Sequence, residues 1–566
     1  MTAFEQALEA QSVPGTNLKG SVDGANWCFL LPRLELGRVL AVGCLAPSSL
    51  ATVAKLGDEV VVWAGVADHD RLRGVIERRS LGNVSILSAE RDGKLPLPDD
   101  EVDVIVVASP RLAGWVDARE LARVLKSNGT FYLERPLLDL RRRHGLESLL
   151  EGARGRDLLW AAPAWGELRF AAPAADSAAV AYIRGRFLKP LFRRQLLKRP
   201  GKVAARTPLA NALVRRRVLM IKGDEENVPT RPPAYVQDIA AKAGTTIESN
   251  RWAFAAPGAY SSQKALFFLF EGEDTQPQSV VKITRDGRHN PRLENEWHAL
   301  GLLREREIGN ERTRPSPLFF GCHAGLAVLG ETAVVGAPFL DRTKATDECP
   351  HARAVVEWLL ELGVSTAHAV SDVTQLVGRL DALLQRFDEL YRPDGETSRL
   401  LEGEMSALAA NADALRLVFQ HGDPGPWNLV VTADGSPGFL DWESADPDGM
   451  PLWDLFHFLR SFGLTVSQKA GRRDPGTSFV DQILAPSGLN RILVETTKRF
   501  CDETDLPTRL VEPLFYFCWV HRAVKEASRL PREELETGRY FNLLLLAVAR
   551  RDAPGLQRLF SLASGA

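Results

Sequence analysis

The sequence has few of the features that would place it in a secreted, membrane or nucleic-acid-binding class. Its 566 residues include only six cysteines, none in a Cys-x-x-Cys pair: Cys28, Cys44, Cys322, Cys349, Cys501 and Cys518. We therefore expect buried, inert thiols in a reducing compartment. The N-terminus, MTAFEQALEA, lacks a basic segment followed by an apolar one, and no run of about twenty apolar residues occurs. These absences predict a cytoplasmic protein without a signal peptide or a membrane span.

Charge of one sign is not in excess either. The 70 lysines and arginines nearly balance the 72 aspartates and glutamates, for a net charge of −2. This balance gives no reason to expect a nucleic-acid partner. A chain of 566 residues is too long for one hydrophobic core, and we expect about two to four compact units.

Apolar runs alternate with helical stretches in the first third of the chain. Five runs read as buried strands: Val39 to Val42, Val60 to Trp63, Val84 to Leu87, Val102 to Val107 and Thr130 to Leu133. Helical stretches such as 118–125 lie between them. This alternation predicts a doubly wound, Rossmann-like α/β domain.

The segments LPLPDDEVDVIVV and ARELARVLKSNGTFYLE resemble a class I methyltransferase domain that binds S-adenosylmethionine. The family has an acid at the end of the first strand and then glycines at alternate positions, so that the backbone can approach the cofactor. Here only Gly43 remains, because Ala41 replaces the acid while Leu45 and Pro47 replace glycines. The second strand ends without an acid for the ribose; the nearby loop acids are Asp68 and Asp92. We expect the fold to be retained and the cofactor site to be lost.

A basic segment follows between residues 184 and 217, where arginines and lysines alternate with Phe and Leu at helical spacing. We expect a pair of helices with basic residues facing water, and contact with an anionic membrane surface is the alternative. Pro229, Pro232 and Pro233 then mark a linker.

The segment QHGDPGPWNLVVTADGSPGFLDWESADPDGMPLWDLFHF, residues 420–458, carries the most specific chemistry. Two short strands joined by the turn ADGSP should bring Asp423, Asn428 and Asp441 to one end of a small sheet. Carboxylate and amide oxygens suit Mg²⁺ held together with substrate phosphates. The alternative is an ordinary loop followed by a solvated strand end.

The order His-Gly-Asp, Asn and then Asp-Trp-Glu resembles the aminoglycoside phosphotransferase and choline kinase family. The resemblance covers roughly the last 320 residues and implies an α+β, bilobal, protein-kinase-like domain. It implies that Asp423 orients the acceptor hydroxyl and takes its proton, and that Asn428 and Asp441 hold Mg²⁺. His421 and Asp454 are expected to be structural.

The same resemblance assigns residues that would bind ATP. Lys282, in the strand SVVKIT, matches the lysine that holds the α- and β-phosphates, and Glu296 matches its acidic partner, with Glu294 as the alternative. The turn between the strands 251–256 and 264–271 would cover the phosphates through Gly258, Ser261 and Ser262; an ordinary hairpin loop is the alternative.

Two further short strands, 326–329 and 332–335, lead into Gly-Ala-Pro-Phe at 336–339. This run resembles the hinge whose main chain meets adenine. Because Pro338 has no N–H, the recognising groups would belong to Ala337 and Phe339. Helices follow, among them 352–362, 373–391 and a buried helix from Pro513.

The sequence thus predicts a methyltransferase-like domain over 1–170, a basic helical connector and linker over 171–235, and a kinase-like domain over 236–566, with lobes of about 245–340 and 341–566. The predicted activity is ATP- and Mg²⁺-dependent phosphorylation of a hydroxyl on a small molecule such as a sugar, an amino alcohol or an antibiotic. A slight excess of basic residues in the tail favours a neutral sugar or an anionic acceptor. The alternatives are a bifunctional enzyme with active methyl transfer and a non-catalytic scaffold.

Overall fold

The computed structural model of the chain divides into two compact units. Unit 1 comprises Met1–Trp297 and Pro317–Ala333, and unit 2 comprises His298–Ser316 and Val334–Ala566. The structure describes residues 22, 24–90, 94–108, 116, 118–136, 158–162, 167–188, 216–222, 231–257, 264–344, 346–472 and 474–564. No helix among these residues is both long and apolar enough to cross a membrane.

Unit 1 is built on a single sheet, in which 13 strands are described. In spatial order these are β12 (Pro317–His323), β13 (Leu326–Thr332), β11 (Ser279–Thr284), β10 (Lys264–Phe270), β9 (Arg251–Ala255), β7 (Phe170–Pro173), β6 (Leu158–Ala162), β8 (Arg216–Lys222), β5 (Leu125–Pro136), β4 (Val102–Val107), β1 (Gly37–Val42), β2 (Gly57–Ala64) and β3 (Val84–Ser88).

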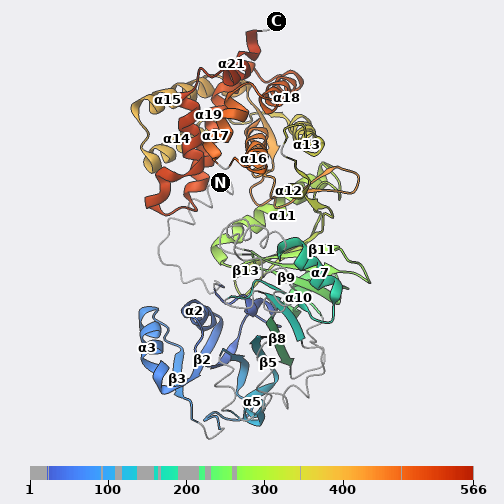
Figure 1. Cartoon of the computed structure of the whole chain (residues 1–566), viewed down its shortest axis with the longest axis vertical. Helices are drawn as coiled ribbons and strands as arrows, with labels where there is room; N and C mark the ends of the chain where they lie inside the picture. Colours follow the sequence, from blue (N-terminus) through green and yellow to red (C-terminus); the bar gives the residue numbers. More distant parts are fainter. Residues whose placement is uncertain are drawn as a thin grey trace. The chain divides into compact units, whose positions relative to one another are not determined.

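The half of this sheet from β3 to β5 is parallel. Its strands alternate along the chain with α2 (Pro47–Leu56), α3 (His69–Arg78) and α5 (Ala118–Val124), and Figure 1 shows α2 and α3 beside β2 and β3. Alternate residues of β1 enter different cores, since Val39 packs in one hydrophobic cluster and Leu40 in another. A strand buried on both faces is typical of a parallel sheet covered by helices. The predicted doubly wound fold is therefore confirmed.

The remaining strands run antiparallel to their neighbours, from β5 through β8 to β12. Strands β7 and β9 pair through Phe170 and Ala255, so the parallel half and the strands around Lys282 belong to one sheet. Strands from both sides of residues 170 and 235 share this sheet, and the predicted division into domains there stays a prediction.

The basic segment is not only helical. Helix α7 (Ser177–Ile183) continues into a π-helix at Arg184–Leu188, but residues 216–222 form strand β8 between β5 and β6. The helical prediction is therefore wrong for 216–222, where the run Val-Leu-Met-Ile has the composition of a strand that can pair on both edges. The basic residues between 189 and 215 lie outside the described part of the chain.

Strand β13 also differs from its prediction. It runs without a break over Leu326–Thr332, whereas two strands were expected over 326–335. Gly330 does not interrupt the strand, because the ring of Phe319 on neighbouring β12 occupies the space above it.

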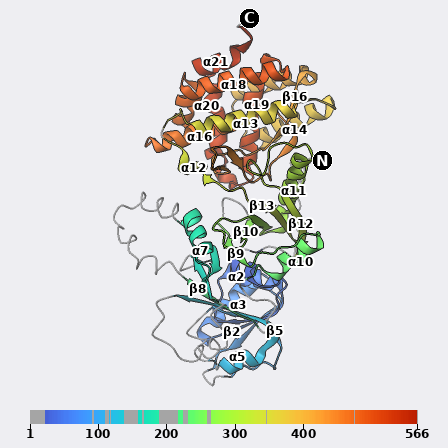
Figure 2. The same cartoon turned by 90° about the vertical axis from the view of Figure 1, so that its right-hand side faces the viewer.

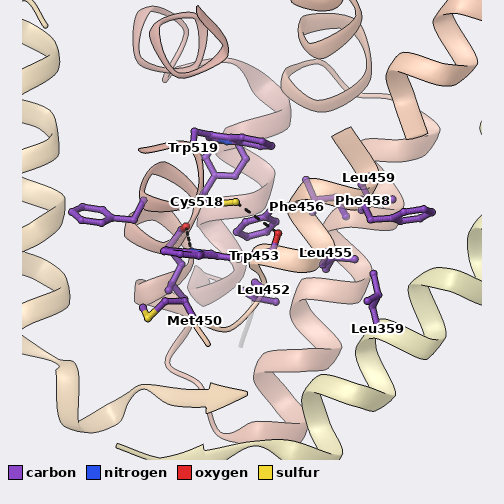
Figure 3. Packing of buried hydrophobic residues seen from close by; sticks show 14 of the residues in the cluster. Leu359, Met450, Leu452, Trp453, Leu455, Phe456, Phe458, Leu459, Cys518 and Trp519 are labelled. Atoms are coloured by element: carbon purple, nitrogen blue, oxygen red, sulfur yellow. Dashed lines mark hydrogen bonds between the residues drawn. The ribbon is translucent and has the colours of Figure 1, made fainter. Parts of the chain in front are cut away.

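Unit 2 is mainly helical (Figure 2). Its longer helices include α13 (Pro350–Thr366), α14 (Val373–Tyr391), α15 (Gly395–Ala410), α16 (Trp453–Lys469), α18 (Gly488–Thr504), α19 (Val511–Ala527) and α20 (Arg539–Ala549). They enclose a large apolar core, in which Trp453, Phe456 and Trp519 are buried (Figure 3). The indole N–H of Trp453 donates to the carbonyl of Leu514, so α16 is fixed against α19 by a buried hydrogen bond as well as by packing.

Two small three-stranded sheets position the polar residues of unit 2. One contains β14 (Ala337–Pro338), β17 (Leu429–Val431) and β18 (Pro437–Phe439), and the other contains β15 (His368–Ala369), β16 (Arg416–Gln420) and β19 (Asp446–Gly449). The predicted hairpin is thus present as β17 and β18, which are antiparallel. The Asp423 loop lies between the second sheet and this hairpin in the chain.

Candidate functional site

The loop that carries Asp423 is held by its backbone. The N–H groups of His421 and Gly422 donate to the carboxylate of Asp454 at the start of α16, at 2.6 and 3.1 Å. Gly422 has φ of 75°, and a Cβ there would overlap the carbonyl oxygen of Ser444. Only glycine fits such a left-handed position against a neighbouring backbone. The left-handed glycine and the two bonds to Asp454 thus fix the backbone just before Asp423.

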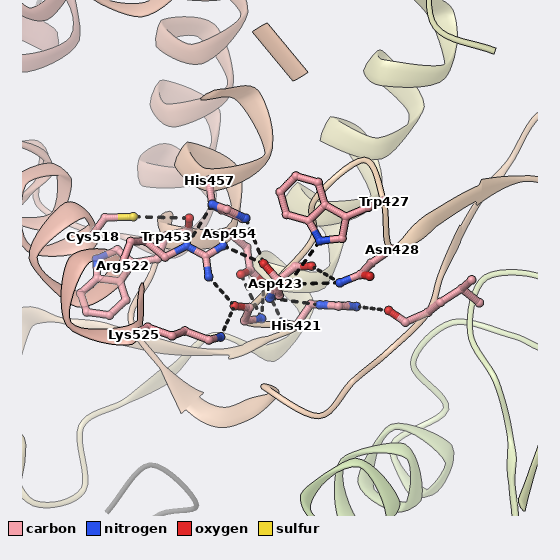
Figure 4. Close-up of polar contacts among 12 residues, drawn as sticks. His421, Asp423, Trp427, Asn428, Trp453, Asp454, His457, Cys518, Arg522 and Lys525 are labelled. Atoms are coloured by element: carbon pink, nitrogen blue, oxygen red, sulfur yellow. Dashed lines mark hydrogen bonds and ion pairs between the residues drawn. The ribbon is translucent and has the colours of Figure 1, made fainter. Parts of the chain in front are cut away.

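One oxygen of Asp423, Oδ1, accepts from two buried side chains (Figure 4). Arg522 Nη2 and His457 Nε2 both lie 3.1 Å from it. Arg522 Nε also donates to His457 Nδ1 over 2.9 Å. Because an arginine nitrogen can only donate, Nδ1 of His457 must accept, and its proton is on Nε2, facing Asp423. Arg522 therefore sets the tautomer of the histidine that orients the carboxylate.

The other oxygen, Oδ2, accepts from the amide of Asn428 at 3.2 Å and from the indole of Trp427 at 3.4 Å. Trp427 is 50% exposed, whereas Arg522 is buried. The side chain of Asp423 itself is 23% exposed. Oδ2 thus faces the more open side of the group, where a substrate could approach.

The electrostatics keep Asp423 ionised. Burial by itself raises the pKa of this carboxyl, but the hydrogen bond from His457 and the charge of Arg522 outweigh it and hold the pKa well below its ordinary value. Burial, together with the charge of Arg522, lowers the pKa of His457 to about 3, so His457 is neutral. A neutral donor and a cation thus both favour the charged form of Asp423.

The hairpin brings Asn428 and Asp441 to one end of β17 and β18. The N–H of Leu440 donates to the carbonyl of Asn428 over 2.8 Å, so Asp441 follows directly at that end. The Asn428 amide nitrogen donates to the carbonyl and to Oδ2 of Asp423, so these two bonds do not use the side-chain oxygen of Asn428, the atom predicted to bind the metal. Asp441 has φ of 66°, a left-handed conformation that aspartate tolerates better than most residues.

These donors fit Mg²⁺ in their chemistry. An amide and a carboxylate oxygen are hard ligands, and phosphate oxygens would have to complete the coordination. The described residues contain no group of three or more His, Cys, Asp and Glu side chains placed to hold a metal by themselves.

In unit 1, Lys282 lies in a buried cluster of four charges. Its Nζ is 2.6 Å from Glu296 and 2.8 Å from Glu331, and Lys264 Nζ is 3.2 Å from Glu296. Glu296 is therefore the acid that pairs with Lys282, while Glu294 is exposed. Burial raises the pKa of Glu331 to about 7, although the charge of Lys282 opposes this and Glu296 adds to it.

The other predicted nucleotide contacts are placed differently. The side chain of Phe339 is buried against Phe458 and Phe462, so only its backbone could meet a ligand. Ala337 pairs with Val431 across β14 and β17. Gly258, Ser261 and Ser262 lie outside the described residues.

Several side chains of these clusters were missed in the sequence. Lys264 and Glu331 lie on strands that flank Lys282, and a charged residue inside an apolar strand was the available signal. His457, Arg522 and Lys525 come from α16 and α19, whose apolar sequence pattern indicates only helices buried in the core. Their meeting at Asp423 depends on tertiary packing.

The methyltransferase-like turn in unit 1 is apolar. Gly43 has φ of 93°, and its N–H donates to the carbonyl of Trp63 on β2. Cys44 and Leu45, which follow, pack against the hydrophobic core of the sheet, and Pro47 is the first residue of α2. Among the described residues of this turn, none is acidic.

Comparison with known proteins identifies a family for part of the chain. Residues 261–484 match the model of the phosphotransferase enzyme family. No curated protein matches the chain.

Three solved structures are similar to the chain at 20% sequence identity or less. An aminoglycoside phosphotransferase from Streptomyces rimosus, in complex with ADP and streptomycin, is 17% identical over 48% of this chain and 91% of its own, with a TM-score of 0.31. A SAM-dependent methyltransferase from Aquifex aeolicus is 20% identical over 26% of this chain and 80% of its own, with a TM-score of 0.18. The bifunctional kinase-methyltransferase WbdD is 14% identical over 83% of this chain and 84% of its own, with a TM-score of 0.25.

The family match includes Lys282, Glu296, the Asp423 loop and both predicted metal ligands, and it ends before α19. Over residues 261–484, less than half of its length, the chain thus matches the phosphotransferase enzyme family.

Proposed function

We propose that this protein transfers the γ-phosphate of ATP to a hydroxyl group of a small molecule, with Asp423 as the group that meets the hydroxyl. The observation that carries the proposal is the environment of the Asp423 carboxylate. One oxygen is fixed by His457 and Arg522, and the other faces the open side together with Asn428. An ionised carboxylate fixed in this way can accept a hydrogen bond from a substrate hydroxyl and orient its lone pair toward phosphorus.

The lowered pKa of Asp423 defines how it would act. A weakly basic carboxylate does not deprotonate an alcohol before the reaction begins. It orients the hydroxyl and receives the proton as the new oxygen–phosphorus bond forms, when the alcohol becomes acidic. Catalysis then rests mainly on positioning and on charge neutralisation.

The remaining groups have roles that follow from their chemistry. Asn428 and Asp441 would hold Mg²⁺, which neutralises phosphate charge when bound. Lys282, whose amine is fixed by Glu296 and Glu331, would contact phosphate oxygens. The backbone groups of Ala337 and Phe339 would meet the adenine ring, and Gly258, Ser261 and Ser262 would lie over the phosphates.

The test is ADP release by the full chain with Mg²⁺ and ATP, in the presence of neutral sugars, sugar phosphates, amino alcohols and aminoglycosides. We expect release to depend on one class of acceptor. Asp423→Asn should lower kcat at least about 100-fold, because the proton acceptor is lost, while ATP affinity stays the same. Turnover of this variant within tenfold of the wild type would show that Asp423 is not the proton acceptor.

A further inference from the structure

Three cations lie on α16 and α19, the two helices that supply His457 and Arg522 to Asp423. Arg460 belongs to α16, and Arg522 and Lys525 belong to α19. Arg522 and Lys525 both donate to the carbonyl of Gly422, at 3.0 and 3.1 Å, and Arg522 also reaches Asp423. The proposed mechanism uses only Arg522, to orient the carboxylate.

Arg460 is the unexplained member of this group. It is only 3% exposed, and neither Nη1 nor Nη2 has a hydrogen-bond partner within the described part of the chain. Burial and the nearby positive charges of Arg539 and Arg522 lower its pKa to about 10, which still leaves it charged. A buried charge without an acceptor is strongly unfavourable, so its retention calls for a ligand.

Arg460 and Arg522 converge on one aromatic ring. Their guanidinium carbons lie 5.0 and 5.6 Å from the ring centroid of Tyr540 on α20. A cation over an aromatic face is stabilised, but the ring offers no hydrogen-bond acceptor to the Nη atoms. Tyr540 is itself partly exposed, so the ring that covers the Arg460 guanidinium reaches solvent.

The nearby carboxylates are already engaged elsewhere. Asp454 accepts from the backbone of His421 and Gly422, and Glu526 accepts from the N–H of Tyr540. Asp423 accepts from His457 and Arg522. Arg522 is thus paired with Asp423, whereas no carboxylate among the described residues accepts a hydrogen bond from Nη1 or Nη2 of Arg460.

We propose that Arg460, Arg522 and Lys525 bind an anionic group, of the phosphate or carboxylate type, on the acceptor molecule. This inference rests on the proposed function, because it takes Asp423 as the group that meets the acceptor hydroxyl. Planar guanidinium groups match the geometry of both anions, and a lysine adds a point charge. The acceptor is then a hydroxylated small molecule with a negative charge close to the hydroxyl that is phosphorylated.

The position of the cluster separates it from the predicted metal ligands. Arg522 contacts Oδ1 of Asp423, and Arg522 and Lys525 contact the backbone of the loop, whereas Asn428 contacts Oδ2. Figure 4 shows Arg522 and Lys525 on one side of Asp423 and Asn428 on the other. All three cations lie in α16 and α19, and Arg522 and Lys525 lie beyond residue 484, where the family match ends.

The first test uses binding alone. The full chain, without nucleotide, is melted in sulfate, inorganic phosphate or acetate at matched ionic strength, with chloride as the reference. If the site takes a phosphate-type group, sulfate and phosphate should raise the melting temperature of the wild type in a saturable way. If it takes a carboxylate, acetate should do so. Arg460→Met should weaken the apparent affinity at least about tenfold, as expected for the loss of a charged hydrogen bond.

Two variants control this result. Arg550→Met removes an exposed arginine at the end of α20 and should leave anion binding unchanged. Lys525→Met should weaken it in the same direction as Arg460→Met, which keeps the test valid if one variant does not fold. Anion binding that is absent in the wild type, or equal in all variants, would overturn the proposal.

The second test separates this proposal from the function on which it rests. Phosphate transfer is measured with glucose, glucose 6-phosphate and gluconate, of which the first is neutral. We expect a charged acceptor to have the lower KM, and Arg460→Met to raise that KM about tenfold without changing the KM for ATP. A rise in the KM for ATP would mean that the cations serve the nucleotide, which contradicts the proposal. Arg460-dependent sulfate binding without any phosphate transfer would refute the proposed function and leave the anion site standing.

Discussion

Two loops of this protein both begin with a left-handed glycine after a buried strand, but the residues that follow differ in polarity. In unit 1 the buried strand β1 is followed by Gly43, with φ of 93°, and in unit 2 the buried strand β16 leads to Gly422, with φ of 75°. After Gly43, the partly buried side chains of Cys44 and Leu45 pack against the core. After Gly422, Asp423 enters a network of four side-chain donors.

The comparison shows that a left-handed glycine at a strand end allows a tight turn but does not by itself make a polar site. In unit 2 the chain adds a carboxylate, and three helical or loop segments add donors that keep it charged. In unit 1 the same kind of turn has become part of the hydrophobic packing, and its first strand ends in Ala41 rather than in an acid. Both units thus have the turn, but only the turn in unit 2 carries a charged side chain with hydrogen-bond donors around it.

The largest effect should come from the metal side of the unit 2 loop. Asp441→Ala is expected to lower the affinity for ATP at least about 100-fold in the presence of Mg²⁺, because a metal ligand is lost. Without Mg²⁺ the two proteins should bind ATP equally. Calorimetry with and without the ion measures both quantities, and equal Mg-ATP affinities would show that Asp441 is only a strand end.

The two glycines offer a matched pair of stability tests. Gly422→Ala should destabilise unit 2 by at least about 2 kcal/mol, because a left-handed φ and an overlap with the Ser444 carbonyl add together. Gly43→Ala carries the φ penalty of about 1–2 kcal/mol. Urea denaturation of the two variants measures the loss of unfolding free energy in each. A larger loss for Gly43→Ala would contradict the view that the unit 2 loop is the more tightly constrained.

His457→Phe should reduce kcat about tenfold, since Asp423 loses one donor and Arg522 Nε loses its acceptor. The pH profile gives a second readout. The hydrogen bond from His457 lowers the pKa of Asp423, so its removal should raise that pKa and move the acidic limb of kcat/KM to higher pH. A lower rate with an unmoved acidic limb would mean that His457 only supports the fold.

The smallest effect is expected in unit 1, where S-adenosylmethionine should not bind. Leu45 and Pro47 place side chains where the methyltransferase family has bare backbone, and Pro47 has no N–H to donate. Two or three lost polar contacts of about 1–3 kcal/mol each would weaken binding by orders of magnitude. Titration of the full chain with the cofactor is the measurement. Micromolar affinity would overturn the contrast between the loops and favour an enzyme with two activities.

Much of the fold was accessible from local pattern. The parallel strands, the hairpin β17–β18 and helix α14 follow from apolar periodicity and turn residues, and all are present. Strand β8 was missed because arginines beside an apolar run fit a helix as well as a strand, and pairing with β5 and β6 decided between them.

For the candidate site, the sequence by itself determined the groups that lie close together along the chain. Asp423, Asn428 and Asp441 are separated by a single loop and a hairpin, so turn chemistry alone brings them together. The pairing of Lys282 with Glu296 was predicted from the family resemblance, with Glu294 as the alternative, and the structure pairs Lys282 with Glu296.

Only the tertiary structure decided what surrounds these groups. Arg522 is about a hundred residues from Asp423 in sequence, and its contact with Asp423 and His457 depends on the packing of α19 against α16. Arg460 and Tyr540 meet in the same way, from two helices that read as ordinary core. The physical reason is that helical periodicity shows which face of a helix is buried, whereas the partner of that face is set by the shape of the whole core.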